Sequence, residues 1–397
     1  MATAQVPAGT IPGQWIVSLK PYATSRAQAQ HLSFVSERTA DDTPFNCTVL
    51  HEYDLDEARG YAASFDDATK EQIEQQSEVA SVEPVQVYKH CEVITANNAP
   101  WGLARVSNYG KVQASGPYTY KYNDAAAGQG VVAYVLDTGI NPKHVQFEGR
   151  ASRGPRFVTD PRPDRPTDDE DHHGHGTHCA GTIGSKDYGV AKKVNIVGVK
   201  VFNDLPDSDP YAGATNSDIA AALDHVVAEY RRHGKPCVVN LSLGGGPSDF
   251  LDNHIAAAVR AGVTVCCAAG NWSEPAERTS PARAPLGLTV SASDVNDKLA
   301  TFSNFGKLVD IIAPGKDVKS TWIGPKNDET NTISGTSMAC PHVVGVACTI
   351  LSNPKVQGKT PFDVASELLI GADKNRISDP NGRFQQRTVN AVAQVAV

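Results

Sequence analysis

Hydrophobic and polar residues alternate differently in two parts of the chain, which predicts two folding units. The first part holds four stretches that alternate like half-buried strands, at residues 14–21, 48–53, 60–65 and 79–88. Two further stretches suit helices, at residues 25–38 and 67–78. The order strand, helix, strand, strand, helix, strand is that of a small split βαβ unit, which should close at about residue 90. Polar, turn-prone residues 97–102 are expected to be the linker.

From residue 128 the pattern changes to near-continuous apolar strands separated by helices. The predicted strands are residues 131–136, 194–201, 237–243, 263–268, 288–292 and 309–312, and the predicted helices include 216–230 and 249–261. Such strands indicate a parallel β-sheet covered by helices on both faces, which is an α/β fold. Ligands of these sheets bind beyond the carboxyl ends of the strands. Chemically informative residues should therefore lie after the strands.

Composition narrows the possible partners. The chain has 397 residues, of which 40% are hydrophobic and 20% charged, and its net charge of −8 argues against nucleic acid or an anionic membrane as partner. No apolar run is long enough to cross a bilayer, and the first residues lack the basic start and apolar core of a secretory signal. The eight cysteines mostly lie within apolar patterns, so we expect buried thiols and a reducing compartment.

The most informative stretch is residues 335–345, where Gly335, Thr336 and Ser337 lead into an apolar helical pattern. Unpaired N–H groups and the helix dipole favour negative charge at such a position. Pro341 has no N–H, so the carbonyl of Ser337 should lose its usual helical partner. Taken alone, the serine could equally be an ordinary helix cap.

Two other stretches supply partners for Ser337. Asp137 ends the predicted strand 131–136, where it could also simply bond to its own turn. Residues 171–182 hold His172, His173, His175 and His178, which raises the alternative of a metal site, but no familiar ligand spacing occurs. The run from residue 174 is more typical of a glycine-flanked histidine that enters a tightly packed helix.

Together Asp137, His175 and Ser337 provide the groups needed for acyl transfer. A serine hydroxyl needs a base to act as a nucleophile, and histidine has a suitable pKa to take and return the proton. A buried carboxylate holds the imidazole in the right tautomer. The order Asp, His, Ser is one of the known orders of this triad.

These three motifs make the chain similar to the subtilisin-like serine proteases, and most of all to their proteinase K branch. The resemblance covers roughly residues 97–380, and residues 98–105 resemble the mature N-terminus of that branch. It implies an inhibitor-type propeptide at 14–92, a ferredoxin-like α+β domain, followed by a subtilisin-like catalytic domain at 97–397. The chain is then expected to be a self-processing serine endopeptidase that its own propeptide inhibits, with self-cleavage near residues 92–96.

The resemblance also assigns further site residues. Asn271 matches the asparagine that donates to the oxyanion, although Asn after Gly270 could be a plain turn residue. Two segments resemble the walls of the primary specificity pocket: Ser242, Leu243, Gly244 and Gly245 form one, and Ala268, Ala269 and Gly270 the other. An ordinary glycine-rich turn at the end of a strand would have the same sequence pattern. Neither wall carries a charge, which implies a broad preference for apolar or aromatic side chains.

Pro285, Gly287 and Asp310 match positions that form a calcium site in the proteinase K branch, two of them through backbone carbonyls. Catalysis itself should need no cofactor, and we expect a monomer that acts on polypeptides. The compartment stays open, because the resemblance implies secretion or a vacuole whereas the cysteines and the N-terminus favour the cell interior.

The chain departs from the family in two places. Residues 203–211 are longer, acidic and contain two prolines, so an acidic rim could favour basic substrate residues away from the cleaved bond. Val132 and Leu288 stand where cysteines are expected, while Cys179 matches the free cysteine beside the catalytic histidine. We therefore expect mercurials to inhibit through crowding of His175.

Two other classes of function remain to be weighed. One is a catalytically silent relative that acts as a binding module, although such proteins usually lose a catalytic residue and none is lost here. The other is a serine esterase or peptide ligase that uses the same site.

Overall fold

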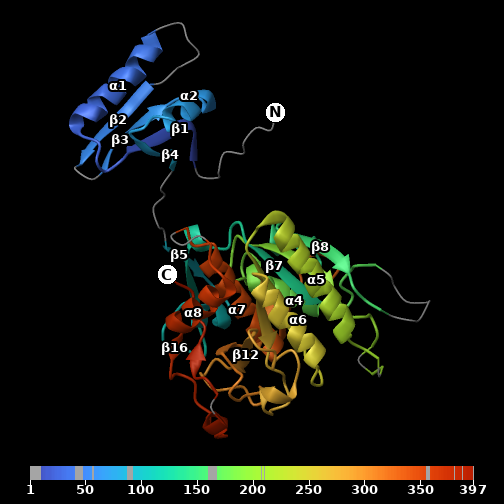
Figure 1. Ribbon diagram of the computed structural model, residues 1–397. Coiled ribbons are helices and arrows are strands. Elements are labelled where there is room, and N and C mark those ends of the chain that lie inside the picture. Colours follow the sequence, from blue (N-terminus) through green and yellow to red (C-terminus); the bar gives the residue numbers. More distant parts are fainter. Residues whose placement is uncertain are drawn as a thin grey trace. The chain divides into compact units, whose positions relative to one another are not determined.

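The computed structural model describes residues 10–40, 48–55, 58–86, 93–159, 168–206, 208–209, 211–354, 358–379, 381–386 and 388–396. The chain forms two compact units, Met1–His90 and Cys91–Val397 (Figure 1). The division between them falls before the predicted linker at 97–102, so that linker is part of the second unit.

The first unit is an antiparallel sheet with two helices. Its elements are β1 (Thr10–Leu19), α1 (Ser25–Ala40), β2 (Thr48–Leu55), β3 (Ala58–Ser64), α2 (Asp67–Glu74) and β4 (Val79–Gln86), and the strands are ordered β2-β3-β1-β4. Val17, Tyr61 and Ile73 are fully buried in its core. The six predicted elements and their order are confirmed, except that α2 ends at Glu74 and not at residue 78.

The second unit is built on a nine-stranded sheet among the described residues, ordered β16-β17-β13-β12-β11-β10-β7-β9-β8. All neighbouring strands are parallel apart from β16 and β17. The strands are β7 (Val132–Asp137), β8 (Ala151–Arg156), β9 (Asn195–Lys200), β10 (Cys237–Leu241), β11 (Thr264–Ala268), β12 (Leu288–Ser293), β13 (Ile311–Pro314), β16 (Asp373–Lys374) and β17 (Ala391–Val392). The six predicted strands are confirmed, and the pattern did not predict β8, β16 and β17.

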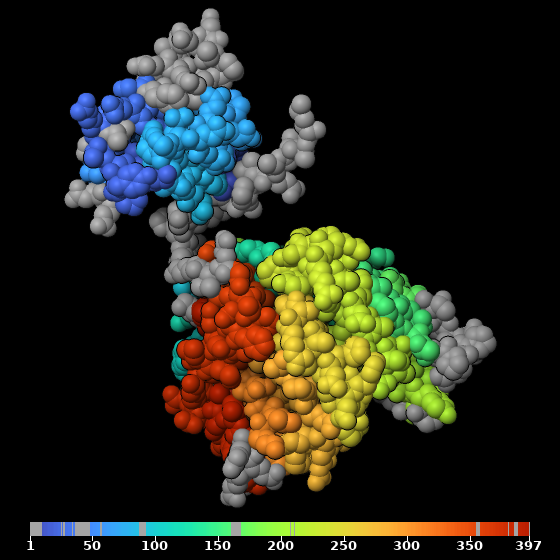
Figure 2. Space-filling view, viewed as in Figure 1, coloured from blue at the N-terminus to red at the C-terminus, as the bar shows by residue number. Residues whose placement is uncertain are grey.

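Helices cover both faces of this sheet, as predicted. Alternate residues of β7 point to opposite sides: Val135 joins a core with α4 and α7, whereas Leu136 joins a second core with α5 and α6. Figure 2 shows α5 (yellow-green) and α6 (yellow) next to each other at the surface of this unit. The bounds are α3 (Trp101–Val106), α4 (His175–Gly184), α5 (Asn216–His233), α6 (Asp249–Arg260), α7 (Thr336–Leu351) and α8 (Pro361–Gly371).

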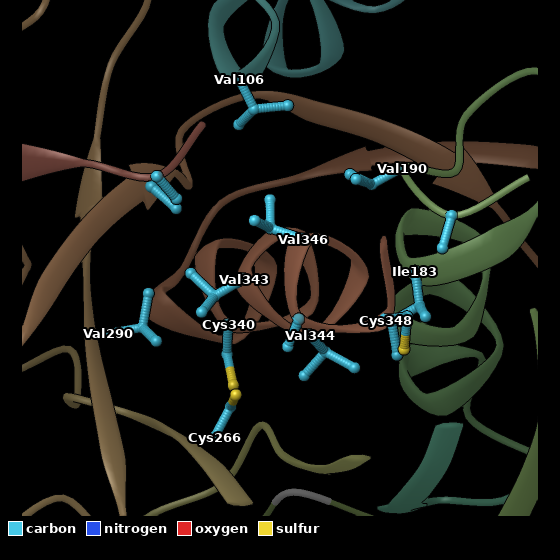
Figure 3. Close-up of a cluster of buried hydrophobic side chains, with 14 of the residues drawn as sticks. Val106, Ile183, Val190, Cys266, Val290, Cys340, Val343, Val344, Val346 and Cys348 are labelled. Atoms are coloured by element: carbon cyan, nitrogen blue, oxygen red, sulfur yellow. The ribbon is translucent and has the colours of Figure 1, made fainter. Parts of the chain in front are cut away.

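Helix α7 runs through the core and is buried along almost its whole length (Figure 3). Its residues Val343, Val344 and Val346 are fully buried, and its Cys340 points toward Cys266 of β11. All six described cysteines are free and buried, and burial raises the pKa of five core thiols and of Cys179. This confirms the expected buried thiols for these six, while Cys47 and Cys91 lie outside the described residues.

Two antiparallel strand pairs lie outside the sheet: β5 (Val93–Asn97) pairs with β6 (Thr119–Asn123), and β14 (Val318–Thr321) pairs with β15 (Thr330–Ile333). The turn-prone stretch that follows β5 is not a linker, because it starts the buried helix α3. Trp101 is only 8% exposed, and Gly102 lies so close to His342 that a Cβ there would be 2.5 Å from the ring Nε2. None of the helices among the described residues has both the length and the apolarity to cross a membrane.

Candidate active site

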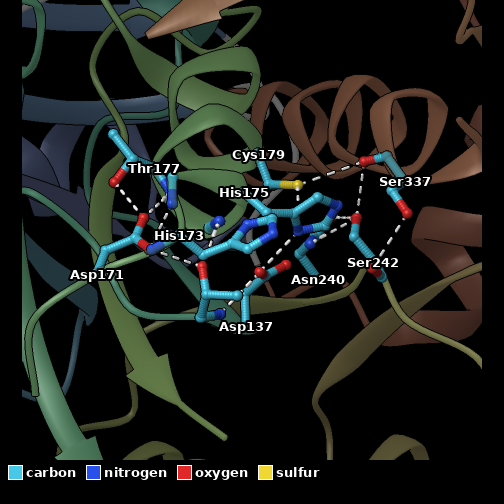
Figure 4. A network of polar contacts seen from close by, with 12 residues as sticks. Asp137, Asp171, His173, His175, Thr177, Cys179, Asn240, Ser242 and Ser337 are labelled. Carbon is cyan, nitrogen blue, oxygen red and sulfur yellow. Dashed lines mark hydrogen bonds and ion pairs between the residues drawn. The ribbon is translucent and has the colours of Figure 1, made fainter. Parts of the chain in front are cut away.

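The site begins with Asp137, the last residue of β7, at the carboxyl end of the sheet (Figure 4). Its side chain is fully buried, and its Oδ1 accepts hydrogen bonds from Nδ1 of His175 at 2.7 Å and from the backbone N of Thr138 at 2.7 Å. A carboxylate can only accept, so Nδ1 of His175 carries the proton and Nε2 is left as the basic nitrogen. Oδ2 of Asp137 is buried and has no hydrogen-bond partner among the described atoms.

His175 is the first residue of α4, and a glycine places it there. Gly174 has φ +100°, and a Cβ on it would lie 2.5 Å from Cε2 of Trp322, so both the backbone and the space require glycine. The His175 side chain is 21% exposed, which leaves one edge of the ring accessible. Figure 4 draws the ring between Asp137 on one side and Ser242 and Ser337 on the other.

The charge of Asp137 decides the pKa of His175. Burial by itself lowers the pKa of an imidazole, but the adjacent carboxylate outweighs it, so the pKa of His175 is raised well above its usual value. The histidines packed nearby behave oppositely. Burial lowers the pKa of His178 to about 3 and that of His342 to about 4, and each donates to a backbone carbonyl, of Val318 and Met338 respectively.

Among the described residues, the four neighbouring histidines are not grouped with one another as a set of metal ligands. His172 pairs with Asp168, His178 bonds to a backbone carbonyl, and His173 stacks edge-on near His175. Among the described residues, a grouping of metal-ligand side chains does occur at Asp137, His175 and Cys179. The first two of these are already joined by their own hydrogen bond.

Asp171 holds the Asp137 turn and the start of α4 together. Its Oδ1 accepts from Thr138 Oγ1 at 2.8 Å, and from the backbone N of His173 and Gly174 at 3.1 and 2.8 Å. Its Oδ2 accepts from N and Oγ1 of Thr177 at 3.0 and 2.6 Å. Burial raises the pKa of a carboxyl, but these hydrogen bonds outweigh it and lower the pKa of Asp171. The sequence pattern contained Asp171, but nothing in it revealed this role.

Lys200, the last residue of β9, is a second buried residue that sequence reasoning missed. It is 1% exposed, and its Nζ donates to the carbonyls of Thr138 and Glu170 at 2.8 Å each and pairs with Asp204 at 2.7 Å. It therefore fastens the turn after Asp137 to the acidic loop that follows β9. A lone Lys at the end of a strand carries no signal that could have announced this.

Ser337 is the second residue of α7 and is half-buried. As expected from Pro341, its carbonyl has no helical partner. It instead accepts hydrogen bonds from Ser242 Oγ at 2.9 Å and Cys179 Sγ at 3.4 Å. Cys179 Sγ also lies 3.9 Å from Nδ1 of His175. The distorted first turn thus ties the serine to the end of β10 and to α4.

One expected contact is not formed. The triad requires the Ser337 hydroxyl to meet His175, but here that hydroxyl donates to the carbonyl of Ser242 at 3.2 Å. The bond to Ser242 is long, and a serine side chain turns readily between staggered rotamers. Catalytic hydrogen bonds often tighten only when substrate binds, so this geometry does not exclude Ser337 as the nucleophile.

Asn271 follows β11 and its amide is oriented by the turn that carries Ser337. Its Oδ1 accepts from the backbone N of Thr336 at 2.8 Å and from Thr336 Oγ1 at 3.0 Å. The amide NH₂ is consequently the end that remains to donate to a substrate. The residue is exposed, and its Nδ2 would be 3.4 Å from a Cβ on Gly335, just before Ser337.

Comparisons with known proteins match each of the two units to a family. The model of the subtilase family matches residues 128–386, and the model described as peptidase inhibitor I9 matches residues 14–90. The chain belongs to the subtilase family. It is a serine endopeptidase that carries an I9 propeptide domain, on the fold that the sequence predicted.

Proteins named as proteases are similar to this chain along most of its length. Alkaline protease 1 of Aspergillus clavatus is 39% identical over 96% of this chain and 92% of that protein. The cuticle-degrading protease of Metarhizium anisopliae is 40% identical over 90% of this chain and 86% of that protein. A solved cold adapted subtilisin-like serine proteinase is 39% identical, covers 76% of this chain and 99% of its own, and superposes with a TM-score of 0.64.

In this subtilase, the two expected pocket walls extend from neighbouring strands. Ser242, Leu243, Gly244 and Gly245 follow β10, and Ala268, Ala269 and Gly270 end and follow β11. The backbone of Gly245 pairs with that of Ser280 in an isolated antiparallel bridge, which braces the first wall. Neither wall bears a charged side chain, which agrees with an uncharged pocket.

A cleft of about 690 Å³ opens beside His175. It is lined by residues of the catalytic turns and of the loop after β9: Thr138, His172, His173, His175, Phe202, Asn203, Asp204, Leu205, Pro206, Ala212, Gly213 and Ser242. Asn203 closes that loop by hydrogen bonds to Tyr211 and Gly213. Of the acidic residues in the loop, Asp204 is already paired with Lys200 and Asp209 accepts from the Tyr211 backbone, while Asp207 lies outside the described residues.

The three candidate calcium ligands lie together at one end of β12 and β13. Pro285 and Gly287 flank Leu286, whose φ is +72°, and Asp310 immediately precedes β13. Oδ2 of Asp310 accepts from the backbone N of Thr289 at 2.8 Å. Burial raises the pKa of Asp310 to about 6 and outweighs the hydrogen bond from the backbone of Thr289, which lowers it.

Proposed function

We propose that Asp137, His175 and Ser337 act as the catalytic triad of this protease and that Asn271 is its oxyanion donor. The observation that carries the assignment is the 2.7 Å hydrogen bond between Asp137 and His175, next to a serine at a helix N-terminus. It leaves Nε2 of His175 free as a base on the side that faces Ser337.

The chemistry follows from these positions. Nε2 takes the hydroxyl proton of Ser337 while Oγ attacks the substrate carbonyl carbon, and the carbonyl oxygen becomes negative. Nδ2 of Asn271 and the backbone N–H of Ser337 donate to that oxygen. The imidazolium then gives its proton to the leaving amine, which departs and leaves an acyl-enzyme. Water repeats the sequence, releases the acid and regenerates the serine.

We further propose that the protein is made as a zymogen that cuts itself near residues 92–96, at the end of the I9 domain. Residues 93–96 lie in β5, paired with β6, so cleavage inside this strand requires the pairing to open. Residue 92 itself lies outside the described residues. The freed I9 domain would then act as the inhibitor of its own enzyme.

The decisive experiment compares the unmodified chain with Ser337→Ala. We expect the unmodified protein to lose an N-terminal fragment ending near residues 92–96, measured by intact mass spectrometry, and to hydrolyse peptides. The Ser337→Ala protein should stay at full length and be inactive. Equal processing of both proteins would refute the assigned nucleophile.

The unmodified chain and Ser337→Ala also distinguish peptide hydrolysis from the other functions. A silent binding module would turn over neither peptides nor esters, and a serine esterase or ligase would process esters or join peptides with little hydrolysis of peptide bonds. Retention of all four catalytic residues, and the protease names of the relatives, favour hydrolysis of peptides.

We also propose that Pro285, Gly287 and Asp310 hold a structural calcium ion. A buried carboxylate whose pKa is raised and two carbonyls on one turn suit a hard cation that prefers oxygen ligands. Asp310→Asn should then abolish the rise in thermal midpoint that calcium produces over a chelator. An unchanged calcium response would refute this site.

A further inference from the structure

Trp272, the residue after Asn271, lies against both walls of the primary specificity pocket. Its side chain is a large apolar group that is nevertheless 56% exposed. A Cβ on Gly270 would lie 2.7 Å from Cζ3 of the indole, and a Cβ on Gly244 would lie 3.6 Å from Cη2. One edge of the ring therefore reaches the wall that follows β10 and the wall that follows β11.

The backbone that carries this ring is held rigidly. The N–H of Trp272 donates to Oδ1 of Asn304 at 3.0 Å, and Nδ2 of Asn304 donates to the carbonyl of Ala269 at 2.9 Å. Asn304 is fully buried, so the anchor is the same side chain that braces the second wall. The ring itself meets the glycines along one edge and is otherwise largely exposed.

Glycine at position 270 is what admits the ring, whereas a Cβ on Gly244 would make only an ordinary contact with it. Gly270 has φ +105°, a conformation that suits glycine, and any side chain there would also collide with Nδ2 of Asn304, 2.4 Å from the Cβ position. The space that glycines open between the two walls is the space in which a substrate side chain would lie. In this chain the indole edge spans it.

We propose that Trp272 determines specificity at P1, the substrate residue that contributes the cleaved carbonyl, by making the pocket shallow. Small uncharged side chains such as Ala fit beneath the indole, whereas Leu and Phe must displace it from its glycine contacts. This inference rests on the proposed function, and it narrows the broad apolar or aromatic preference that the sequence implied to small residues.

The test uses the processed enzyme and blocked tetrapeptide p-nitroanilides that differ only in P1, with Ala, Leu or Phe. Pocket fit commonly changes kcat/KM by about 10–200-fold per methylene group. We expect the unmodified enzyme to prefer Ala. Trp272→Ala should raise kcat/KM for Phe relative to Ala by at least about tenfold, mainly through KM, and Trp272→Phe should fall between the two.

The matched control is Phe362→Ala, which removes another exposed aromatic side chain, on α8, that is 53% exposed. It should leave the P1 preference unchanged. The inference would be overturned if kcat/KM for Phe relative to Ala were the same in Trp272→Ala and in the unmodified enzyme. It would also be overturned if the unmodified enzyme preferred Phe at P1.

Failure of the proposed function would look different. If the unmodified enzyme and Ser337→Ala were equally inactive on every peptide and neither reacted with a fluorophosphonate, then the triad assignment itself would be wrong. Stoichiometric labelling of Trp272→Ala by the fluorophosphonate shows that this variant is folded, so that its P1 ratio decides the question.

Discussion

Two buried aspartates, Asp137 and Asp171, lie on either side of Thr138 in the active site and have opposite surroundings. Asp171 accepts five hydrogen bonds, shared between both of its oxygens. Asp137 accepts two, both at Oδ1, and its Oδ2 has no partner among the described atoms. The same kind of buried side chain thus has its charge satisfied by hydrogen bonds in one place and left largely unsatisfied in the other.

The difference shows how one residue type serves two purposes. Backbone and hydroxyl groups donate hydrogen bonds to the charged carboxylate of Asp171, and these bonds fix the shape of two turns. The charge of Asp137 has few other donors, so its main partner is the imidazole, whose protonated form it stabilises. We therefore expect loss of Asp137 to affect the chemical step directly and loss of Asp171 to affect it through geometry.

The largest effect is expected from Asp137→Asn. An amide can donate to Nδ1 and so favours the wrong tautomer of His175, and we expect kcat to fall by about 10⁴. The measurement is steady-state kinetics with active-site titration. A loss of less than tenfold would remove the distinction between the two aspartates.

Asp171→Asn should lower kcat by about 10–100-fold with little change in KM, because displaced catalytic groups lose their alignment. It should also cost about 1–3 kcal/mol of stability, since an amide cannot accept all five donors. The lowered pKa of Asp171 means that its contribution is present above its unfolded pKa and is lost as pH falls. Unfolding should therefore be measured near pH 8.

The control for this variant is Asp218→Asn on α5. Asp218 is also buried and accepts from N and Oγ1 of Thr159 at 3.0 and 2.6 Å, outside the active site. The Asp218→Asn variant should lose stability but keep its kcat. If both variants lowered kcat alike, the role of Asp171 would be general stability and not alignment.

Inhibition by mercurials that bind Cys179 tests how much space there is beside Asp137 and His175. Its Sγ lies 3.9 Å from Nδ1 of His175, so a mercurial bound there would crowd the ring. We expect Cys179→Ala to need at least about tenfold more mercurial for half-inhibition, consistent with a thiol being the reactive group. Equal sensitivity of the variant and the unmodified enzyme would show that mercury acts elsewhere.

The pH profile measures the charge effect of Asp137 directly. The base must be neutral, so kcat/KM falls as pH drops through the pKa of His175, by about tenfold per pH unit. Because this pKa is raised, the loss should begin above pH 6.5. The midpoint should move down in Asp137→Asn and stay in place in Asp171→Asn, and a common shift in both would contradict the comparison.

The smallest effect is expected from the acidic residues of the loop after β9. Asp207→Asn combined with Asp209→Asn should reduce cleavage of Lys- or Arg-rich peptides by a few-fold, about the size of an exposed charge interaction. Neutral peptides serve as the control. Equal changes on all peptides would reject a role in selectivity.

Much of the architecture was readable in advance because it depends on periodicity. The strands at 237–243 and 263–268 are buried on both faces, and uninterrupted apolar runs have little alternative. Short strands such as β16 and β17, of two residues each, have no period to detect and form only where a neighbour offers its edge. The stretch at 97–102 was misread as a linker because turn residues look alike whether exposed or starting a buried helix.

The sequence alone determined the fold class and singled out Asp137, His175 and Ser337 as the proposed triad, because their motifs combine residue type, glycine spacing and strand ends. Only the tertiary structure decided what surrounds them. The donors to Asp171, the bonds of Lys200 and the position of the Trp272 ring join residues far apart in the chain. Such contacts depend on packing in three dimensions, which leaves no periodic signal along the chain.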